Sequence, residues 1–186
     1  ADIVLGGYLK YLLGTAGLGF MYVREPLSTE LTPTTSGWFS QQDIHAMAIS
    51  DNTPAASARR FEGGTPNVPG LYACNAGLDV IKEVGIGPIS DHIAYITQQI
   101  KAGVRERGWL LATGEGPHGA MLAVRSHDMH GLVAKAEEEG VVISCRDDNI
   151  RISPHFYNDD GDIERLFSAL DKHRSLLKEH TATAAP

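Results

Sequence analysis

One lysine near the start of the chain lies in surroundings that could make its amine reactive. The stretch ADIVLGGYLKYLLGTAGLGFMYVRE holds Lys10 among apolar residues and glycines. Residues 3–5 predict a short buried strand, Gly6 and Gly7 a break, and residues 20–23 a second strand, so Lys10 lies on their connection. A cationic side chain is costly in apolar surroundings, so this lysine either reaches water or is used as a nucleophile. The commoner role of such a lysine is to mark the end of a strand.

A glycine turn in the segment ARRFEGGTPNVPG has the chemistry to bind an anion. Gly63 and Gly64 allow a tight turn, Thr65 offers a hydroxyl, and a helix is predicted directly afterwards, over residues 68–84. Backbone N–H groups and a hydroxyl at such a turn suit a phosphate group. Most glycine pairs bind nothing, so this pattern alone indicates only a turn with that capacity.

A third candidate is an arginine on a strand predicted near the C-terminus. Arg151 lies between Ile150 and Ile152, so if these pack inward its guanidinium faces the opposite side of the strand. A planar fork of donors on a rigid strand can hold a carboxylate through two hydrogen bonds. The alternative is a surface ion pair with Asp147 or Asp148.

The elements that must position these residues follow from periodicity and turn residues. A polar loop follows residue 24, and a second helix with an isoleucine stripe extends from residue 89. Further elements are two strands between 109 and 124 and a helix capped by Ser126 or Asp128 that ends at 139. A hairpin over 141–154, with its turn at residues 147–149, and a final helix capped by Asn158 or Asp159 follow. We therefore expect an α/β chain: one part over residues 1–85, a small α/β domain with a short, mainly antiparallel sheet over 86–178, and a disordered tail over 179–186.

Composition excludes several classes of partner. The 186 residues are 42% hydrophobic and 21% charged, enough to bury a core. With 16 Lys and Arg against 23 Asp and Glu, the net charge of −7 makes the chain a poor general binder of nucleic acid or of anionic membranes. No apolar run is long enough to cross a membrane. One disulfide between Cys74 and Cys145 is formally possible, but free thiols in a cytoplasmic protein are the expectation.

The three stretches, in this order, resemble segments of the class V aminotransferase family, fold-type I enzymes that use pyridoxal 5'-phosphate (PLP). YLKYLLGTAGLGFMYVR resembles the lysine segment of that family, RRFEGGTP its "RFE-x-GT-P" segment, and IRISPHFYNDDGDI its segment near the C-terminus. The last two are most similar to a group that includes selenocysteine lyase-like and isopenicillin N epimerase-like proteins. The resemblance implies that residues 1–85 are the C-terminal part of the PLP-binding large domain, followed by the small domain.

The resemblance also implies a role for each candidate residue. Lys10 would form a Schiff base with PLP and later act as the base at the substrate Cα, and burial among apolar residues would favour its neutral amine. Thr65, and less directly Gly64, would contact the PLP phosphate of the neighbouring subunit in a homodimer with shared active sites. Arg151 would bind the α-carboxylate of an amino-acid substrate, with Arg146 as a second candidate.

The sequence also departs from the family pattern. Family members are longer, so we expect the chain to be the C-terminal part of an enzyme. In the family an aspartate contacts the pyridine nitrogen of PLP, and we expect that residue to lie upstream. Asp2 is too near Lys10 for that role. Without that acid the pyridine ring of PLP withdraws electrons from the substrate much less strongly. We therefore expect little activity and poor PLP binding from this polypeptide alone. Desulfurases of the family carry a reactive cysteine on a loop, whereas Cys145 lies on a predicted strand, which disfavours cysteine desulfuration. Transamination, epimerisation and other lyase reactions stay open.

Two alternatives come from other classes of function. The chain could be a non-catalytic relic that acts as an interaction module through apolar surface at residues 3–13. A metal enzyme is the weaker alternative, because His127 and His130 could share a helical face but no acidic or cysteine partner follows at ligand spacing.

Overall fold

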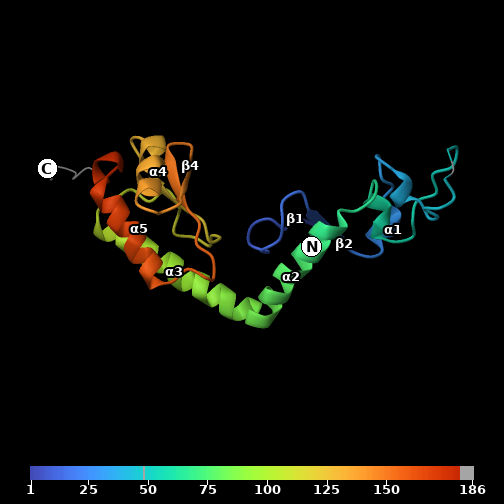
Figure 1. The fold of residues 1–186 in the computed structure, drawn as a ribbon, viewed down its shortest axis with the longest axis horizontal. Coiled ribbons are helices and arrows are strands. Elements are labelled where there is room, and N and C mark those ends of the chain that lie inside the picture. Colours follow the sequence, from blue (N-terminus) through green and yellow to red (C-terminus); the bar gives the residue numbers. More distant parts are fainter. Residues whose placement is uncertain (48, 181–186) are drawn as a thin grey trace. The chain divides into compact units, whose positions relative to one another are not determined.

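The computed structural model describes residues 1–47 and 49–180, which fall into two compact units (Figure 1). The first unit is Ala1–Val84 and the second begins at Gly85. Gly85 has φ of 91°, a left-handed conformation that glycine adopts without strain, and it separates two helices. Each unit is described by itself below.

The first unit begins with a two-stranded antiparallel sheet. β1 (Ile3–Gly7) pairs with β2 (Gly19–Val23), with Ile3 opposite Val23 and Gly7 opposite Gly19. Both predicted strands are confirmed, but β1 continues through the break expected at Gly6 and Gly7. The expected burial of residues 3–5 is wrong, since Leu5 is 71% exposed, because no described element of this unit covers those side chains.

The connection between these strands is a compact turn that carries Lys10. The N–H of Gly14 donates to the carbonyl of Tyr8 at 2.7 Å, and the N–H of Leu13 donates to the carbonyl of Lys10 at 3.0 Å. Leu13 has φ of 55°, which costs free energy for a non-glycine residue and requires support from its surroundings. Helix α2 (Val68–Val84) provides that support.

Helix α2 and the Lys10 turn are in direct backbone contact. Gly77 is buried in the helix, and a Cβ atom there would lie 2.6 Å from the carbonyl oxygen of Leu13 and 2.7 Å from that of Leu12. A Cβ at Gly14 would lie 2.8 Å from the sulfur of buried Cys74. Two glycines therefore allow the turn to pack against the helix without intervening side chains.

In the described part of the polar segment between β2 and α2 lie three short helices. They are α1 (Leu27–Glu30), η1 (Trp38–Ser40) and η2 (Ala58–Phe61). The sequence predicted an irregular loop after residue 24, so α1 was not expected. Its four residues carry no apolar periodicity that a sequence pattern could detect.

The second unit is an α/β domain with one three-stranded sheet. Its elements are α3 (Ile86–Glu106), β3 (Leu122–Arg125), α4 (Met129–Glu138), β4 (Ser144–Arg146), β5 (Asn149–Ile152), α5 (Asp160–Lys172) and η3 (Arg174–Leu176). The strand order is β3-β5-β4, and both pairings are antiparallel. The expected short antiparallel sheet is confirmed.

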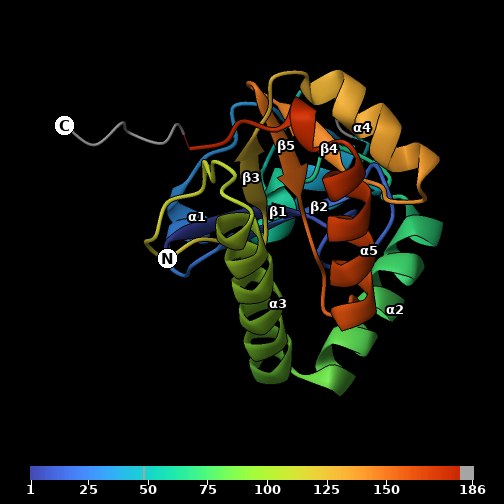
Figure 2. The same ribbon diagram turned by 90° about the vertical axis from the view of Figure 1, so that its left-hand side faces the viewer.

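One face of this sheet packs against helices. Within the unit α3 and α5 run alongside each other (Figure 2). Side chains from α3, α4, α5, β3 and β5, together with Trp109 from the segment after α3, form a single core. Its members include Ile96, Ile100, Val104, Leu122, Val124, Leu132, Ile150, Ile152, Leu166, Phe167 and Leu170. The isoleucine stripe predicted on α3 reaches this core through its C-terminal half.

Local signals placed several ends of these elements correctly. Asp147 and Asp148, with φ of 52° and 59°, form the turn of the predicted β4–β5 hairpin, which is one residue shorter than expected because Asn149 already pairs as the first residue of β5. Asp128 caps α4 by accepting from the N–H of Gly131. Asp159 caps α5 in a reciprocal arrangement with Asp162.

The end of the chain differs from the prediction. Glu179 forms an isolated antiparallel bridge with Trp109, and the N–H of His180 donates to the carbonyl of Gly108 at 2.9 Å. The expected disorder is therefore wrong for residues 179 and 180, because their backbone pairs with the segment after α3. Residues 181–186 lie outside the described residues. Residues 109–113, in the segment after α3, form isolated bridges where a full strand was predicted.

The contact between α2 and the Lys10 turn can be tested with a pair of helical glycines. Alanine at an interior helix position normally stabilises by about 1 kcal/mol relative to glycine. Gly77→Ala should instead lower the free energy of unfolding by about 1–3 kcal/mol, because the methyl group meets backbone carbonyls that cannot rotate away. Gly87→Ala in α3 is the control, since apart from its chain neighbours and the nearby backbone of its own helix no heavy atom lies within 4 Å of its Cβ position. Equal effects of the two substitutions in urea titrations would show that the contact is absent.

The cap of α5 should make stability depend on pH. A hydrogen bond from the Asn158 side chain, then one from the Asp159 N–H and one from Arg165, lower the pKa of Asp162. Because the folded-state pKa lies below the unfolded value, the stabilisation is present above the unfolded carboxyl pKa and is lost as pH falls through the folded one. Asp162→Asn should therefore lower the denaturation midpoint at pH 7 and lose this difference from wild type in acid. Glu164→Gln on the same helix should show neither effect.

Candidate functional site

Lys10 is exposed in this chain, so the expected burial of its side chain is wrong. Among residues 1–47 and 49–180, its amine has no hydrogen-bond or ion-pair partner. The other lysine of the first unit, Lys82, lies 3.3 Å from the carboxylate of Asp79. The amine of Lys10 is thus accessible on a turn whose backbone is fixed by its hydrogen bonds and by α2.

The predicted phosphate turn packs against residues 37–39, whose sequence is Gly-Trp-Phe. A Cβ atom at Gly37 would overlap the carbonyl oxygen of Gly63, so the two backbones approach as closely as glycine permits. The Cβ position of Gly64 lies 3.8 Å from the indole nitrogen of Trp38. Thr65 is exposed, and its hydroxyl has no hydrogen-bond partner in the described part of the chain.

Two arginines directly before this turn hold the surrounding loops together. The guanidinium of Arg60 donates to the carbonyls of Ala55 at 2.8 Å, Thr29 at 2.7 Å and Leu31 at 3.0 Å. Arg59 donates to the carbonyls of Phe39 and Gln42. Hydrogen bonds from a charged donor to carbonyls are among the stronger ones, so this pair fixes the base of the glycine turn. Sequence analysis missed this role because carbonyl acceptors leave no sequence signal.

A cavity of about 940 Å³ lies in the first unit between the β1–β2 sheet and the segment that leads into the glycine turn. Its lining residues are Leu5, Gly6, Leu18, Gly19, Phe20, Met21, Ala58, Arg59, Phe61, Glu62, Gly63, Gly64, Pro66 and Leu71. Gly64 therefore borders the cavity, whereas Lys10 and Thr65 do not line it.

Arg151 lies on β5 in the second unit, with the alternation that the sequence predicted. Ile150 and Ile152 are buried and Arg151 is half-buried on the opposite face. Its neighbours across the sheet are small, Ala123 on β3 and Ser144 on β4, which leaves room around the guanidinium. In the described part of the chain Arg151 forms no ion pair, so the alternative pairing with the turn aspartates is absent.

Arg146 ends β4 on the same face of the sheet and is exposed. It lies opposite Asn149 of β5, two residues from Arg151. The structure thus brings the two predicted carboxylate-binding arginines to one face of one sheet. Lys10, Gly64 and Thr65 all belong to the first unit.

Cys145 directly precedes Arg146 in sequence but lies on the other face of the sheet, opposite Ile150. Its sulfur is 3.4 Å from Nδ1 of His130 on α4, and the residue is half-buried. Cys74 and Cys145 are both free, as predicted. Within residues 1–47 and 49–180, no group of three or more His, Cys, Asp and Glu residues could hold a metal ion.

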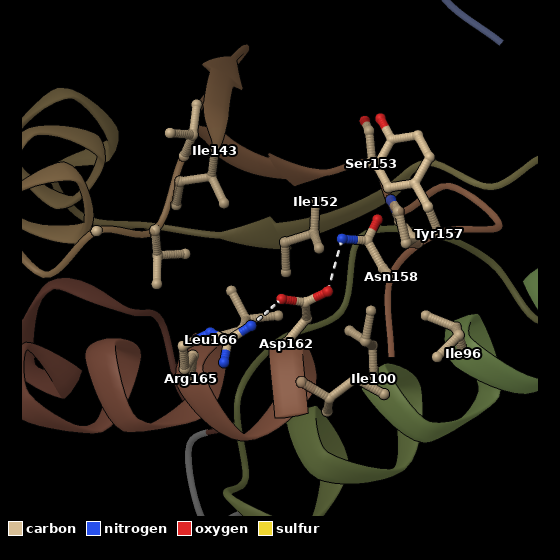
Figure 3. Close-up of a pocket in the computed structure, with 15 residues that line it drawn as sticks. Ile96, Ile100, Ile143, Ile152, Ser153, Tyr157, Asn158, Asp162, Arg165 and Leu166 are labelled. Atoms are coloured by element: carbon tan, nitrogen blue, oxygen red, sulfur yellow. Dashed lines mark hydrogen bonds and ion pairs between the residues drawn. The ribbon is translucent and has the colours of Figure 1, made fainter. Parts of the chain in front are cut away.

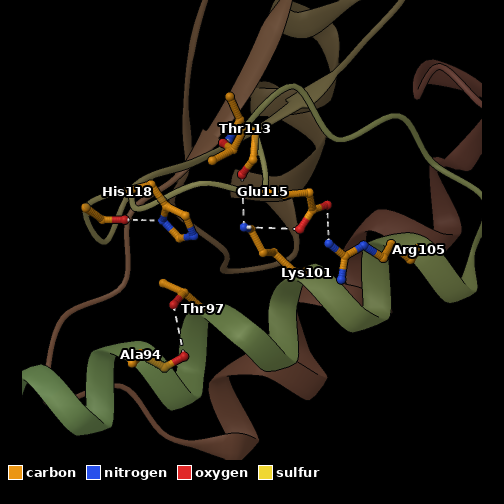
Figure 4. Close-up of polar contacts among 10 residues, drawn as sticks. Ala94, Thr97, Lys101, Arg105, Thr113, Glu115 and His118 are labelled. Carbon is orange, nitrogen blue, oxygen red and sulfur yellow. Dashed lines mark hydrogen bonds and ion pairs between the residues drawn. The ribbon is translucent and has the colours of Figure 1, made fainter.

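A buried lysine on α3 anchors a loop of the second unit (Figure 4). Lys101 is 4% exposed and donates to the carbonyl of Gly114 at 3.1 Å, with Glu115 at 4.0 Å. Arg105, one turn further along α3, also pairs with Glu115 and lowers the pKa of that carboxyl group. Because both cations end on one loop, their role is structural.

The second unit also contains a pocket of about 410 Å³ between α3, α5 and the residues that flank β4 and β5 (Figure 3). Its lining includes the apolar side chains of Ile96, Ile100, Ile152 and Leu166, and Asp162 lies among them with its Asn158 and Arg165 partners. None of the predicted site residues lines it. The Asp162 carboxylate is already occupied by the α5 cap, so this pocket has no free charged group from that residue.

Comparison with known proteins supports the predicted family. The model of the family described as "Aminotransferase class-V" matches residues 1–166. An uncharacterized aminotransferase of Bacillus subtilis (strain 168), YcbU, is 34% identical over 158 residues, which are 84% of this chain and 41% of that protein. A cysteine desulfurase of Cronobacter sakazakii is 27% identical over 187 residues, covering 89% of this chain and 44% of that protein.

Solved structures show the same fold. A cysteine desulfurase from Thermococcus onnurineus NA1 superimposes with a TM-score of 0.84 at 20% identity, covering 95% of this chain and 48% of that one. A mutant of the lyase C-DES, described with glycine covalently linked to its PLP cofactor, gives 0.79 at 21% identity, covering 91% and 46%. The expected fold class is confirmed. The chain spans less than half the length of these relatives, and among its described helices none could cross a membrane. From the match over residues 1–166, the chain belongs to the class V aminotransferase family.

Proposed function

We propose that this chain supplies the lysine and the carboxylate-binding arginine of a PLP-dependent enzyme that acts on an amino acid. The observation that carries the proposal is the state of Lys10. Its amine is accessible and without a described partner on a turn braced by α2, inside the region matched by the family model.

The residues present fit PLP at two points. The free amine of Lys10 suits an aldehyde, and the exposed hydroxyl of Thr65 beside Gly64 suits a phosphate. When bound, PLP supplies the aldehyde for a Schiff base and a ring that withdraws electrons from the substrate Cα. Because family members share sites between subunits, we assign Thr65 and Gly64 to the site of a partner subunit in a homodimer.

We assign three residues of this chain separate roles toward the substrate. Arg151 binds the α-carboxylate with its two parallel donors and so fixes the orientation of the Cα–H bond. The Nζ atom of Lys10, as a free amine beside the bound substrate, would accept the Cα proton as a general base. Arg146, on the same sheet face, is the second carboxylate candidate.

A reaction other than cysteine desulfuration fits the second unit better. Cys145 is held on the helix-covered face near His130, away from the face that carries Arg151. The β4–β5 connection is only the two-residue turn at Asp147 and Asp148, too short to be a loop that presents a thiol. We therefore propose transamination, epimerisation or another lyase reaction. Two free thiols suit a reducing cytoplasm.

A second candidate function is supported by exposed apolar side chains of the first unit. These include Ile3, Val4, Leu5, Leu9, Tyr11, Met21 and Tyr22. A chain that acts only as an interaction module would use such a surface to associate. Sedimentation at micromolar concentration separates the two functions: tight self-association together with no PLP attachment would favour the module.

Attachment of PLP to Lys10 is the direct test. The chain incubated with PLP and then reduced with borohydride should carry one pyridoxyl group, located on Lys10 by peptide mass spectrometry. We expect attachment to be weak and turnover of added amino acids to be near background, because the acid partner of the pyridine nitrogen is not among these residues.

Matched lysine variants distinguish specific attachment of PLP at Lys10 from labelling of any exposed amine. Lys10→Ala should abolish the adduct, and Lys82→Ala should leave it unchanged. Labelling spread evenly over the lysines, or undiminished in Lys10→Ala, would contradict the proposal. Rapid turnover by the chain alone would contradict the expected dependence on further residues.

A further inference from the structure

The arginines of the second unit fall into two groups. Arg105, Arg107, Arg165 and Arg174 each form an ion pair with a carboxylate. Arg125, Arg146 and Arg151 form none among residues 85–180, and these three are the arginines of the sheet. We call them the arginine face.

Strand register places all three on one side of the sheet. Asn149 lies opposite Arg125 on β3 and opposite Arg146 on β4, and Arg151 is two residues further along β5. Residues two apart in a strand point to the same face, about 7 Å from each other, and neighbouring strands are about 5 Å apart. The three arginines therefore start from one small area of the same sheet face, with Arg151 at one end and the other two at the opposite end.

The absence of ion pairs on this face is not due to a shortage of acids. Acidic residues outnumber basic ones from Gly85 onward. Asp147 and Asp148 follow Arg146 directly, yet neither reaches ion-pair distance of it or of Arg125. Like charges gathered without counter-charges repel one another, so the arrangement is stabilised when an anion binds.

From this geometry we infer the substrate class: an amino acid whose side chain carries a second carboxylate. This inference rests on the proposed role of Arg151. With the α-carboxylate on Arg151, a chain of two or three carbons leads towards Arg125 and Arg146, whose donors can hold the distal acid. An uncharged side chain would leave both guanidiniums without a partner, so the face selects for the dianionic substrate.

Binding of glutarate and glutaramate to the chain tests this inference without any enzymatic activity. The two ligands have the same length and differ by one charge. Side-chain Nε–Hε resonances of arginine, followed by NMR at pH 7, should shift at Arg125, Arg146 and Arg151, and glutarate should bind at least tenfold more tightly than glutaramate.

Substitutions assign the preference to particular residues. Arg125→Gln and Arg146→Gln should each reduce the preference for glutarate at least threefold and leave glutaramate binding unchanged, whereas Arg151→Gln should weaken both ligands. Arg165→Gln on α5 removes the same charge off the sheet and should change neither, and amide spectra confirm that every variant is folded. Equal affinity for the two ligands, no binding of either, or an equal effect of Arg165→Gln would overturn the inference.

The outcome is separable from that of the proposed function. PLP attachment at Lys10 with no preference for glutarate would refute the dicarboxylate substrate alone. A glutarate preference without attachment at Lys10 would leave the arginine face as a dicarboxylate site and refute the Schiff-base role.

Discussion

The structure of the first unit depends on the direct contact between Gly77 of α2 and the carbonyls of Leu12 and Leu13. This contact supports a turn in which Leu13 has a positive φ, and that turn carries Lys10. A lysine on a flexible loop would lose much conformational entropy on reacting with a bound aldehyde, whereas one on a braced turn has lost most of it during folding. Gly14 extends the same contact to Cys74.

Close backbone approach by glycine recurs at the second functional element. Gly37 lies directly against Gly63, and Arg59 and Arg60 hold the loops on either side through backbone carbonyls. The second unit uses a different device, a sheet whose one face is filled by core residues and whose other face presents arginines. The proposed chemistry therefore requires both units, since the amine belongs to one and the guanidiniums to the other.

Sequence reasoning succeeded where a local period or a turn residue decides the outcome. The alternation of Ile150, Arg151 and Ile152 placed the guanidinium on the exposed face, and the aspartate pair at 147 and 148 located the hairpin. It failed where a distant partner decides. Lys101 has the charge of a solvated residue but is buried by the loop at Gly114. Burial of residues 3–5 needed a covering element that this unit does not provide.

The central claim is that Lys10 and Arg151 serve one site. It is tested most directly by competition between small amines and Lys10 for PLP, read as the loss of the borohydride-trapped adduct on Lys10. Alanine and ethylamine differ by the carboxylate. In wild type, alanine should release Lys10 at a concentration at least ten times lower than ethylamine does, after both concentrations are corrected for the reaction of each free amine with PLP in solution. Arg151→Gln should abolish this advantage of alanine. An advantage that persists unchanged in Arg151→Gln would contradict the claim.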